Sequence, residues 1–172
     1  MDLPSKDYLH ECLIYYPHTG LLVWRTRPVE HFANVRAWKS WNTKYANNQA
    51  FRSIDKDGYY YGCINGKNQK AHRIIFKMLH GWEPPQIDHD DRNKQNNKEL
   101  NLKAATAEVN SRNQGISKAN TSGAVGVYFR YGKWNARLAQ KHLGAFNTFE
   151  EAVEARKKAQ VTAGYHINHG VV

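Results

Sequence analysis

Three polar residues in the middle of the chain are of the types that could hydrolyse a phosphodiester. They are Asp88, His89 and Asn110. Carboxylate and amide oxygens are hard ligands suited to Mg²⁺ or Mn²⁺, which keeps several waters and accepts a substrate phosphate as a further ligand. A neighbouring imidazole can take a proton from water. The set therefore predicts metal-assisted phosphodiester hydrolysis.

The elements that must position these residues are short. Residues 86–110 predict a strand that ends at Asp88 and His89, a polar loop, a second strand around 101–104 and a helix starting near Thr106. An ideal strand points neighbouring side chains to opposite faces, so both residues can serve one site only where the strand is ending. The two strands and the helix could then bring the carboxylate, the imidazole and the last amide together.

This ordered set resembles the ββα-metal motif of the HNH nuclease family. In that motif an Asp-His pair is followed by Asn about a dozen residues later and by His or Asn on the next helix. The matching residues are Asp88-His89, Asn101 and Asn110, and Asn at the third position looks like the H-N-N variant common among phage homing endonucleases. His72-Arg73 on a preceding helix also looks like the phage-type subgroup.

The resemblance implies a role for each residue. Asp88 and Asn110 would hold one Mg²⁺ or Mn²⁺ ion per active site, His89 would be the general base, and Asn101 would brace the loop behind it, with no organic cofactor. His72 has two interpretations: it touches the scissile phosphate, or it is a helix-face imidazole bonded to a neighbouring carbonyl.

A structural interpretation of the same segment stays open. In it, the Asp88-His89 pair is a turn and Asn110 caps a helix. Asn96 and Asn97 are interpreted as loop residues in either case, because their sequence context is typical of loops.

The charge of the chain points to a polyanionic partner. The 172 residues carry a formal net charge of +10, and no acid occurs between Glu108 and Glu150. Six basic residues fall in that stretch: Arg112, Lys118, Arg130, Lys133, Arg137 and Lys141. A nucleic acid could lie on such a surface, and the alternative is a solvated basic face.

The same stretch predicts a small sheet covered by a helix. Strands are expected over 126–130, 133–139 and 142–146, followed by a helix with a Thr148/Glu151 capping box. Alternation on the middle strand places Trp134 on the buried face and basic residues on the other.

This arrangement resembles the AP2 DNA-binding domain. The resemblance runs through Ser122-Gly123, Val125-Gly126-Val127, Trp134-Asn135-Ala136-Arg137, Leu143-Gly144-Ala145-Phe146 and Glu150-Glu151-Ala152. It implies a sheet lying in the major groove, with nucleic-acid contacts from Arg130, Lys133, Trp134, Arg137 and Lys141. A plain structural three-stranded module is the alternative.

The expected fold class is α+β, in three regions. Residues 1–66 form a small α/β N-terminal region with possible DNA contact, 67–115 the HNH nuclease core, and 116–172 an AP2-like three-stranded antiparallel sheet packed on one helix. Upstream of the core, helices are expected over 6–16 and 71–81 and strands over 21–24 and 59–64. Residues 25–51 have no clean period and receive no assignment.

Several classes of protein are disfavoured by composition. No stretch approaches the roughly 20 apolar residues of a membrane helix, and the N-terminus lacks the design of a secretory signal. Two cysteines, Cys12 and Cys63, fit a reducing cytoplasm, that of a host cell if the protein is phage-encoded.

The resulting expectation is an HNH endonuclease that hydrolyses double-stranded DNA, of the phage homing type, with no membrane partner and with monomer and dimer both open. The alternatives are a catalytically inactive sequence-specific DNA-binding regulator and an RNA-directed nuclease. Duplex DNA is favoured because a three-stranded basic sheet fits a B-form major groove and not the deep, narrow groove of A-form RNA.

Overall fold

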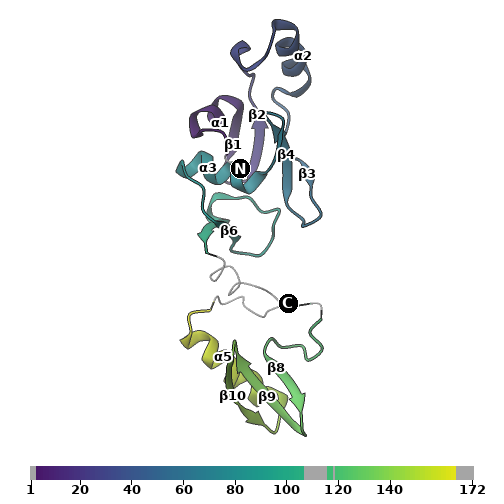
Figure 1. The fold of residues 1–172 in the computed structure, drawn as a ribbon, viewed down its shortest axis with the longest axis vertical. Coiled ribbons are helices and arrows are strands. Elements are labelled where there is room, and N and C mark those ends of the chain that lie inside the picture. Colours follow the sequence, from purple (N-terminus) through teal and green to yellow (C-terminus); the bar gives the residue numbers. More distant parts are fainter. Residues whose placement is uncertain (1–2, 107–115, 118, 166–172) are drawn as a thin grey trace. The chain divides into compact units, whose positions relative to one another are not determined.

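The chain folds into two compact units. The computed structural model describes residues 3–106, 116–117 and 119–165, and the units comprise residues 1–106 and 107–172 (Figure 1). Elements of the first unit are α1 (Lys6–Cys12), β1 (Leu13–Tyr16), β2 (Leu21–Trp24), the 3₁₀ turn η1 (Val29–His31), α2 (Val35–Tyr45), β3 (Ser53–Ile54), β4 (Tyr60–Ile64), β5 (Lys67–Lys70), α3 (Ala71–His80), β6 (Gln86–His89), the 3₁₀ turn η2 (Glu99–Asn101) and β7 (Leu102–Ala105).

All strand pairs of the first unit are antiparallel and belong to small sheets. β1 pairs with β2, β3-β4-β5 form a three-stranded sheet, and β6 pairs with β7. Helices and small sheets occur together, so the α+β class expected from the sequence fits the structure.

Helix α3 lies at the centre of the first unit's core. Its side chains Ile74, Ile75 and Met78 are buried at the helical spacing that the sequence shows. The helix ends at Gly81, whose φ of 80° is a left-handed conformation that glycine adopts without strain. Leu9 of α1 and Leu102 of β7 belong to the same core. The expected regions 1–66 and 67–115 therefore share one hydrophobic core over the residues described, which end at 106 in this unit.

The predicted helix over 6–16 is wrong in its second half. The helix ends at Cys12, and β1 pairs with β2 from Leu13 opposite Trp24 to Tyr16 opposite Leu21. The sequence Leu-Ile-Tyr-Tyr of β1 is rich in β-branched and aromatic residues, which pack well in a strand. Apolar spacing did not reveal the change from helix to strand, because Leu13 is an apolar residue that suits a buried position in a helix as well as in a strand.

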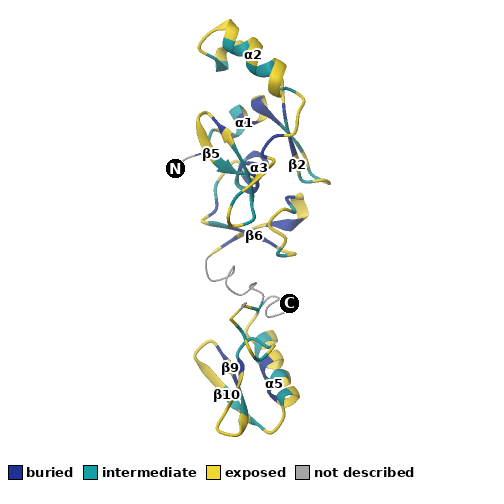
Figure 2. Cartoon of the chain, turned by 90° about the vertical axis from the view of Figure 1, so that its right-hand side faces the viewer, coloured by how far each residue is buried: buried dark blue, intermediate teal, exposed yellow. Residues whose placement is uncertain are grey.

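The unassigned region 25–51 contains helix α2. Figure 2 shows α2 with intermediate and exposed residues, and none of its residues is buried. The helix begins after Asn34, whose side-chain oxygen accepts the backbone N–H of Ala37. Its aromatic residues face the body of the unit, where Trp41 contacts Trp24 edge to face at 5.1 Å between ring centres.

The second unit matches its prediction closely. β8 (Val127–Arg130), β9 (Lys133–Leu138) and β10 (Lys141–Phe146) form a sheet in the order β10-β9-β8, and α5 (Phe149–Thr162) begins with the predicted capping box of Thr148 and Glu151. Val127, Ala136 and Ala152 form its buried core between sheet and helix. No helix among the described residues is long and apolar enough to cross a bilayer.

Candidate active site

The hairpin of β6 and β7 presents the Asp-His pair. His89 stands opposite Leu102 and Asp88 opposite Lys103, and β6 ends at His89 as predicted. His89 is buried and Asp88 is half-buried, and the charge of Asp88 acts on the pKa of His89. The expected helix near Thr106 and the expected ligand Asn110 lie outside the described residues.

His89 makes a hydrogen bond that sets its tautomer. Its Nε2 lies 3.2 Å from Oδ1 of Asn97, and both side chains are 3% exposed. An amide oxygen is an acceptor, so the ring proton resides on Nε2 and the lone pair on Nδ1. Burial lowers the pKa of His89, while the Asn97 bond and the charges of Asp91 and Asp88 act in the opposite direction. The imidazole is thus held neutral and configured as a base.

Asn97 is a loop residue, as its sequence context predicts, and its side chain also bonds to His89. Its side chain faces His89, and its backbone carbonyl accepts the hydroxyl of Tyr15 at 2.8 Å. A run of asparagines carries no signal that distinguishes the one that turns inward, so the sequence alone could not reveal this residue.

Asn101 connects the two ends of the loop behind His89. Its Oδ1 accepts the backbone N–H of Asp91 at 3.0 Å, and its Nδ2 donates to the Asp91 carboxylate at 2.9 Å and to the carbonyl of Asn96 at 2.7 Å. Asn101 is buried. These three bonds hold the loop in the geometry that brings Asn97 to the imidazole.

The β1–β2 hairpin supports the same loop from outside. The backbone N–H of Glu99 donates to the carbonyl of Pro17 at 3.2 Å. Gly20 packs so closely on the loop that a Cβ there would lie 2.7 Å from the carbonyl carbon of Asn97 and 2.8 Å from the nitrogen of Lys98. The N-terminal hairpin is therefore part of the site's framework.

His72 of α3 packs directly behind the catalytic candidate. Its ring lies edge-on to His89 at 5.2 Å between centres and 4.8 Å from Tyr59, and the residue is 6% exposed. Burial and the neighbouring His89 lower the pKa of His72 to about 3. A buried neutral ring favours a packing role over direct contact with a phosphate.

Two lysines lie on the ring of Tyr59, which is 5.8 Å from His89 between ring centres. The Nζ atoms of Lys70 and Lys94 lie 4.0 and 4.9 Å from the centre of the Tyr59 ring. Lys94 also donates to the carbonyl of Asp57 at 2.9 Å. These cations from two separate segments were missed by sequence analysis because only the fold brings them to one aromatic ring.

Asp88 is the one expected metal ligand that the structure describes. The described residues contain no group of three His, Cys, Asp or Glu side chains that could hold a metal ion. A Mg²⁺ ion that keeps its waters needs one or two carboxylates together with substrate phosphate. The half-buried Asp88 carboxylate, whose charge acts on both His89 and Tyr59, fits such an ion.

Comparison with known protein families gives a match in this region. The family model of the HNH endonuclease matches residues 69–112, which include α3, β6, the loop and β7. The match supports an HNH nuclease. The comparisons with curated proteins and with solved structures gave no match.

The second unit lies beyond the HNH match and carries the other predicted contacts. Strand pairing places Arg130, Lys133 and Arg137 on the sheet face opposite α5. Trp134 instead packs on Phe149 of α5 at 5.0 Å between ring centres, so it is a core residue and not part of the basic face. Lys141 stands opposite Leu138, on the helix side of the sheet. Alternation along β9 predicted that Trp134 lies on the buried side of the sheet. The position of Lys141 on that side follows from the register of β10.

We expect Gly20→Ala to disturb the HNH site from the N-terminal hairpin. Its φ of 78° and the backbone of Asn97 and Lys98 leave no room for a methyl group, so the variant should lose about 1–3 kcal/mol of stability. The ¹⁵N shifts of the His89 imidazole should move as well. Gly66→Ala is the matched control, because Gly66 has a φ of 74° with no atom within 4 Å of its Cβ position. Equal effects of both variants would contradict the contact.

We expect His72 to make the protein sensitive to acid. Its pKa is about 3 in the folded chain and about 6.5 in an unfolded one. Below pH 6.5 the unfolded chain takes up a proton that the folded chain refuses, so stability is full above that pH and falls toward pH 3 by up to about 1.4 kcal/mol per pH unit. Urea unfolding at several pH values should show this loss reduced in His72→Phe and kept in His80→Gln. An identical profile in His72→Phe would refute it.

Proposed function

We propose that this protein is a metal-dependent endonuclease that hydrolyses phosphodiester bonds of double-stranded DNA at the β6–β7 hairpin. The observation that carries the proposal is the buried His89, whose Nε2 bonds to the Asn97 amide oxygen. This contact places the basic lone pair on Nδ1, in a region that matches the HNH endonuclease family.

The reaction follows from the placement of these side chains. Nδ1 of His89 takes a proton from a water, whose oxygen attacks phosphorus in line with the leaving 3′ oxygen. The resulting imidazolium keeps its Nε2–H bond to Asn97, so the base does not have to turn when it becomes charged. His72 and Tyr59 pack against the ring and restrict its orientation.

Charge stabilisation at the phosphate comes from two sources. A divalent ion on Asp88 and Asn110 would supply Lewis-acid stabilisation of the phosphate and the leaving oxygen. Lys94, on the Tyr59 ring beside His89, adds positive charge where an anionic substrate would lie, whereas Lys70 on the same ring is paired with Asp55 and Asp57. Mg²⁺ or Mn²⁺ suits this oxygen donor set.

The basic face of the second unit supports duplex DNA as the substrate. Arg130, Lys133 and Arg137 share one side of a three-stranded sheet, as in the AP2 domain that the sequence resembles. The H-N-N residue set further supports a homing-type role in a phage-infected cell, with the host cytoplasm as its place of action.

Cleavage of supercoiled plasmid tests the nuclease directly. The wild-type chain should cut with Mg²⁺ and stop in EDTA, and His89→Ala should cut at least about 10²–10⁴-fold more slowly because the base is gone. Its affinity for DNA should stay nearly unchanged. His80→Ala, an exposed histidine at the end of α3, is the control and should cut normally. Full activity of His89→Ala would refute the mechanism, and DNA binding by a wild type that does not cut would indicate the regulator.

A salt series tests the basic sheet face. Arg130→Gln/Arg137→Gln should lower the slope of log K against log salt by about 1.8, because each lost phosphate contact contributes about 0.9. Lys157→Gln/Lys158→Gln removes the same charge from exposed positions of α5 and should leave the slope unchanged. If the two double variants lose equal affinity, the sheet face is not the DNA contact.

A further inference from the structure

Helix α2 packs one side against the first unit and leaves its other side exposed. None of its residues is buried, and it lies at the end of the unit away from β6 (Figures 1 and 2). Trp41 on the inner side packs against the core of the unit, whereas the residues of the outer side take no part in that core.

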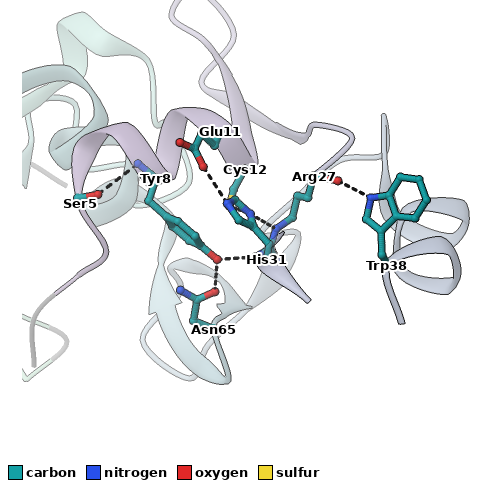
Figure 3. Close-up of polar contacts among 8 residues, drawn as sticks. All are labelled: Ser5, Tyr8, Glu11, Cys12, Arg27, His31, Trp38 and Asn65. Carbon is teal, nitrogen blue, oxygen red and sulfur yellow. Dashed lines mark hydrogen bonds and ion pairs between the residues drawn. The ribbon is translucent and has the colours of Figure 1, made fainter. Parts of the chain in front are cut away.

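The helix is attached through the backbone of one buried residue, Arg27. The carbonyl of Arg27 accepts Nε1 of Trp38 at 2.8 Å and Nδ2 of Asn42 at 3.0 Å, and its N–H donates to Oδ1 of Asn42 at 2.9 Å. Figure 3 shows the Trp38 bond. Three directional bonds to a single peptide segment fix the rotation of α2 about its own axis.

The side chain of Arg27 is held equally firmly. It is 6% exposed, and its guanidinium carbon lies 5.0 Å from the ring centres of both Phe32 and Trp41. Its Nε donates to Nδ1 of His31 at 3.2 Å, and another guanidinium nitrogen donates to the Tyr8 hydroxyl (Figure 3). Because Tyr8 belongs to α1, these contacts tie α2 to the body of the unit.

This attachment turns a basic face of α2 outward. Arg36, Lys39, Ser40 and Thr43 are exposed and recur at the i, i+3, i+4, i+7 spacing of one helix face. No acid occurs between Glu30 and Asp55, and neither Arg36 nor Lys39 forms an ion pair with the described residues. The face thus carries uncompensated positive charge beside hydroxyl donors.

We propose that this outer face of α2 docks on the sugar-phosphate backbone of duplex DNA, away from the bond that is cut. The inference rests on the proposed function for the identity of the polyanion. Arg, Lys, Ser and Thr are the side chains that contact phosphate oxygens, and an α-helix fits a DNA groove. Because α2 and β6 lie at opposite ends of the unit, the contact supplies affinity and leaves the chemistry to the HNH site.

Binding in EDTA separates this contact from cleavage. Arg36→Gln/Lys39→Gln should bind duplex DNA about tenfold more weakly at moderate salt and lower the slope of log K against log salt by about 1.8. Single-turnover cleavage at saturating protein should stay unchanged, because the catalytic residues are untouched. Lys157→Gln/Lys158→Gln on α5 removes the same charge and should bind normally; an equal loss there would overturn the proposal.

A second variant tests the orientation of the helix instead of its charge. Asn42→Ala keeps every charge and removes two of the bonds to Arg27, so it should weaken duplex binding severalfold. Circular dichroism confirms that the variant is folded. Unchanged affinity would show that a fixed α2 is not needed and would overturn docking in a defined orientation.

The outcomes keep this inference apart from the nuclease proposal. A wild type that cleaves, with binding and salt slope unaffected in Arg36→Gln/Lys39→Gln, would refute the α2 contact and leave the nuclease standing. A chain that binds DNA through α2 without cutting would refute the nuclease proposal and leave the α2 contact standing. Equal affinity for duplex RNA would overturn the assignment to DNA.

Discussion

The hydrogen bond between His89 and Asn97 is the constraint on which the geometry of the candidate site depends. A buried imidazole can act as a base only if it stays neutral and if its lone pair is on the nitrogen that meets the substrate. The Asn97 amide oxygen places the ring proton on Nε2 and so leaves the lone pair on Nδ1, and burial lowers the pKa of His89. Everything that holds Asn97 in place therefore helps to fix the His89 ring.

Two separate parts of the chain hold that asparagine. Asn101 bonds across the loop, and in the β1–β2 hairpin Tyr15 donates its hydroxyl to the Asn97 carbonyl while Gly20 allows the turn to approach the loop backbone. The N-terminal hairpin is therefore structurally continuous with the HNH region, although the family match begins at residue 69. Burying His72 beside His89 costs stability in acid, which is the consequence of packing two neutral rings together.

The surfaces proposed to bind DNA differ from the HNH site, because the buried side of each element determines which charged side chains are exposed. On β9 the polar face is what remains after Trp134 and Ala136 have been used for packing under α5. On α2 the outward face is set by the bonds between Asn42 and the Arg27 backbone. In both cases the buried side of an element decides which charges are presented, so packing and hydrogen bonding determine the orientation of the basic side chains.

Local sequence was sufficient to predict those elements whose residue pattern is compatible with only one secondary structure. Spacing and residue type predicted the apolar side of α3, the Thr148/Glu151 capping box and the three strands of the second unit. They also singled out the ordered residues Asp88, His89 and Asn101. Tertiary structure decided the rest, because those features depend on partners distant in the chain. Leu13 joins a strand because Trp24 pairs with it, and Lys70 and Lys94 meet only on the Tyr59 ring. Asn97 differs from Asn96 only because the loop turns it toward His89, and that loop is held by Asn101 and the β1–β2 hairpin.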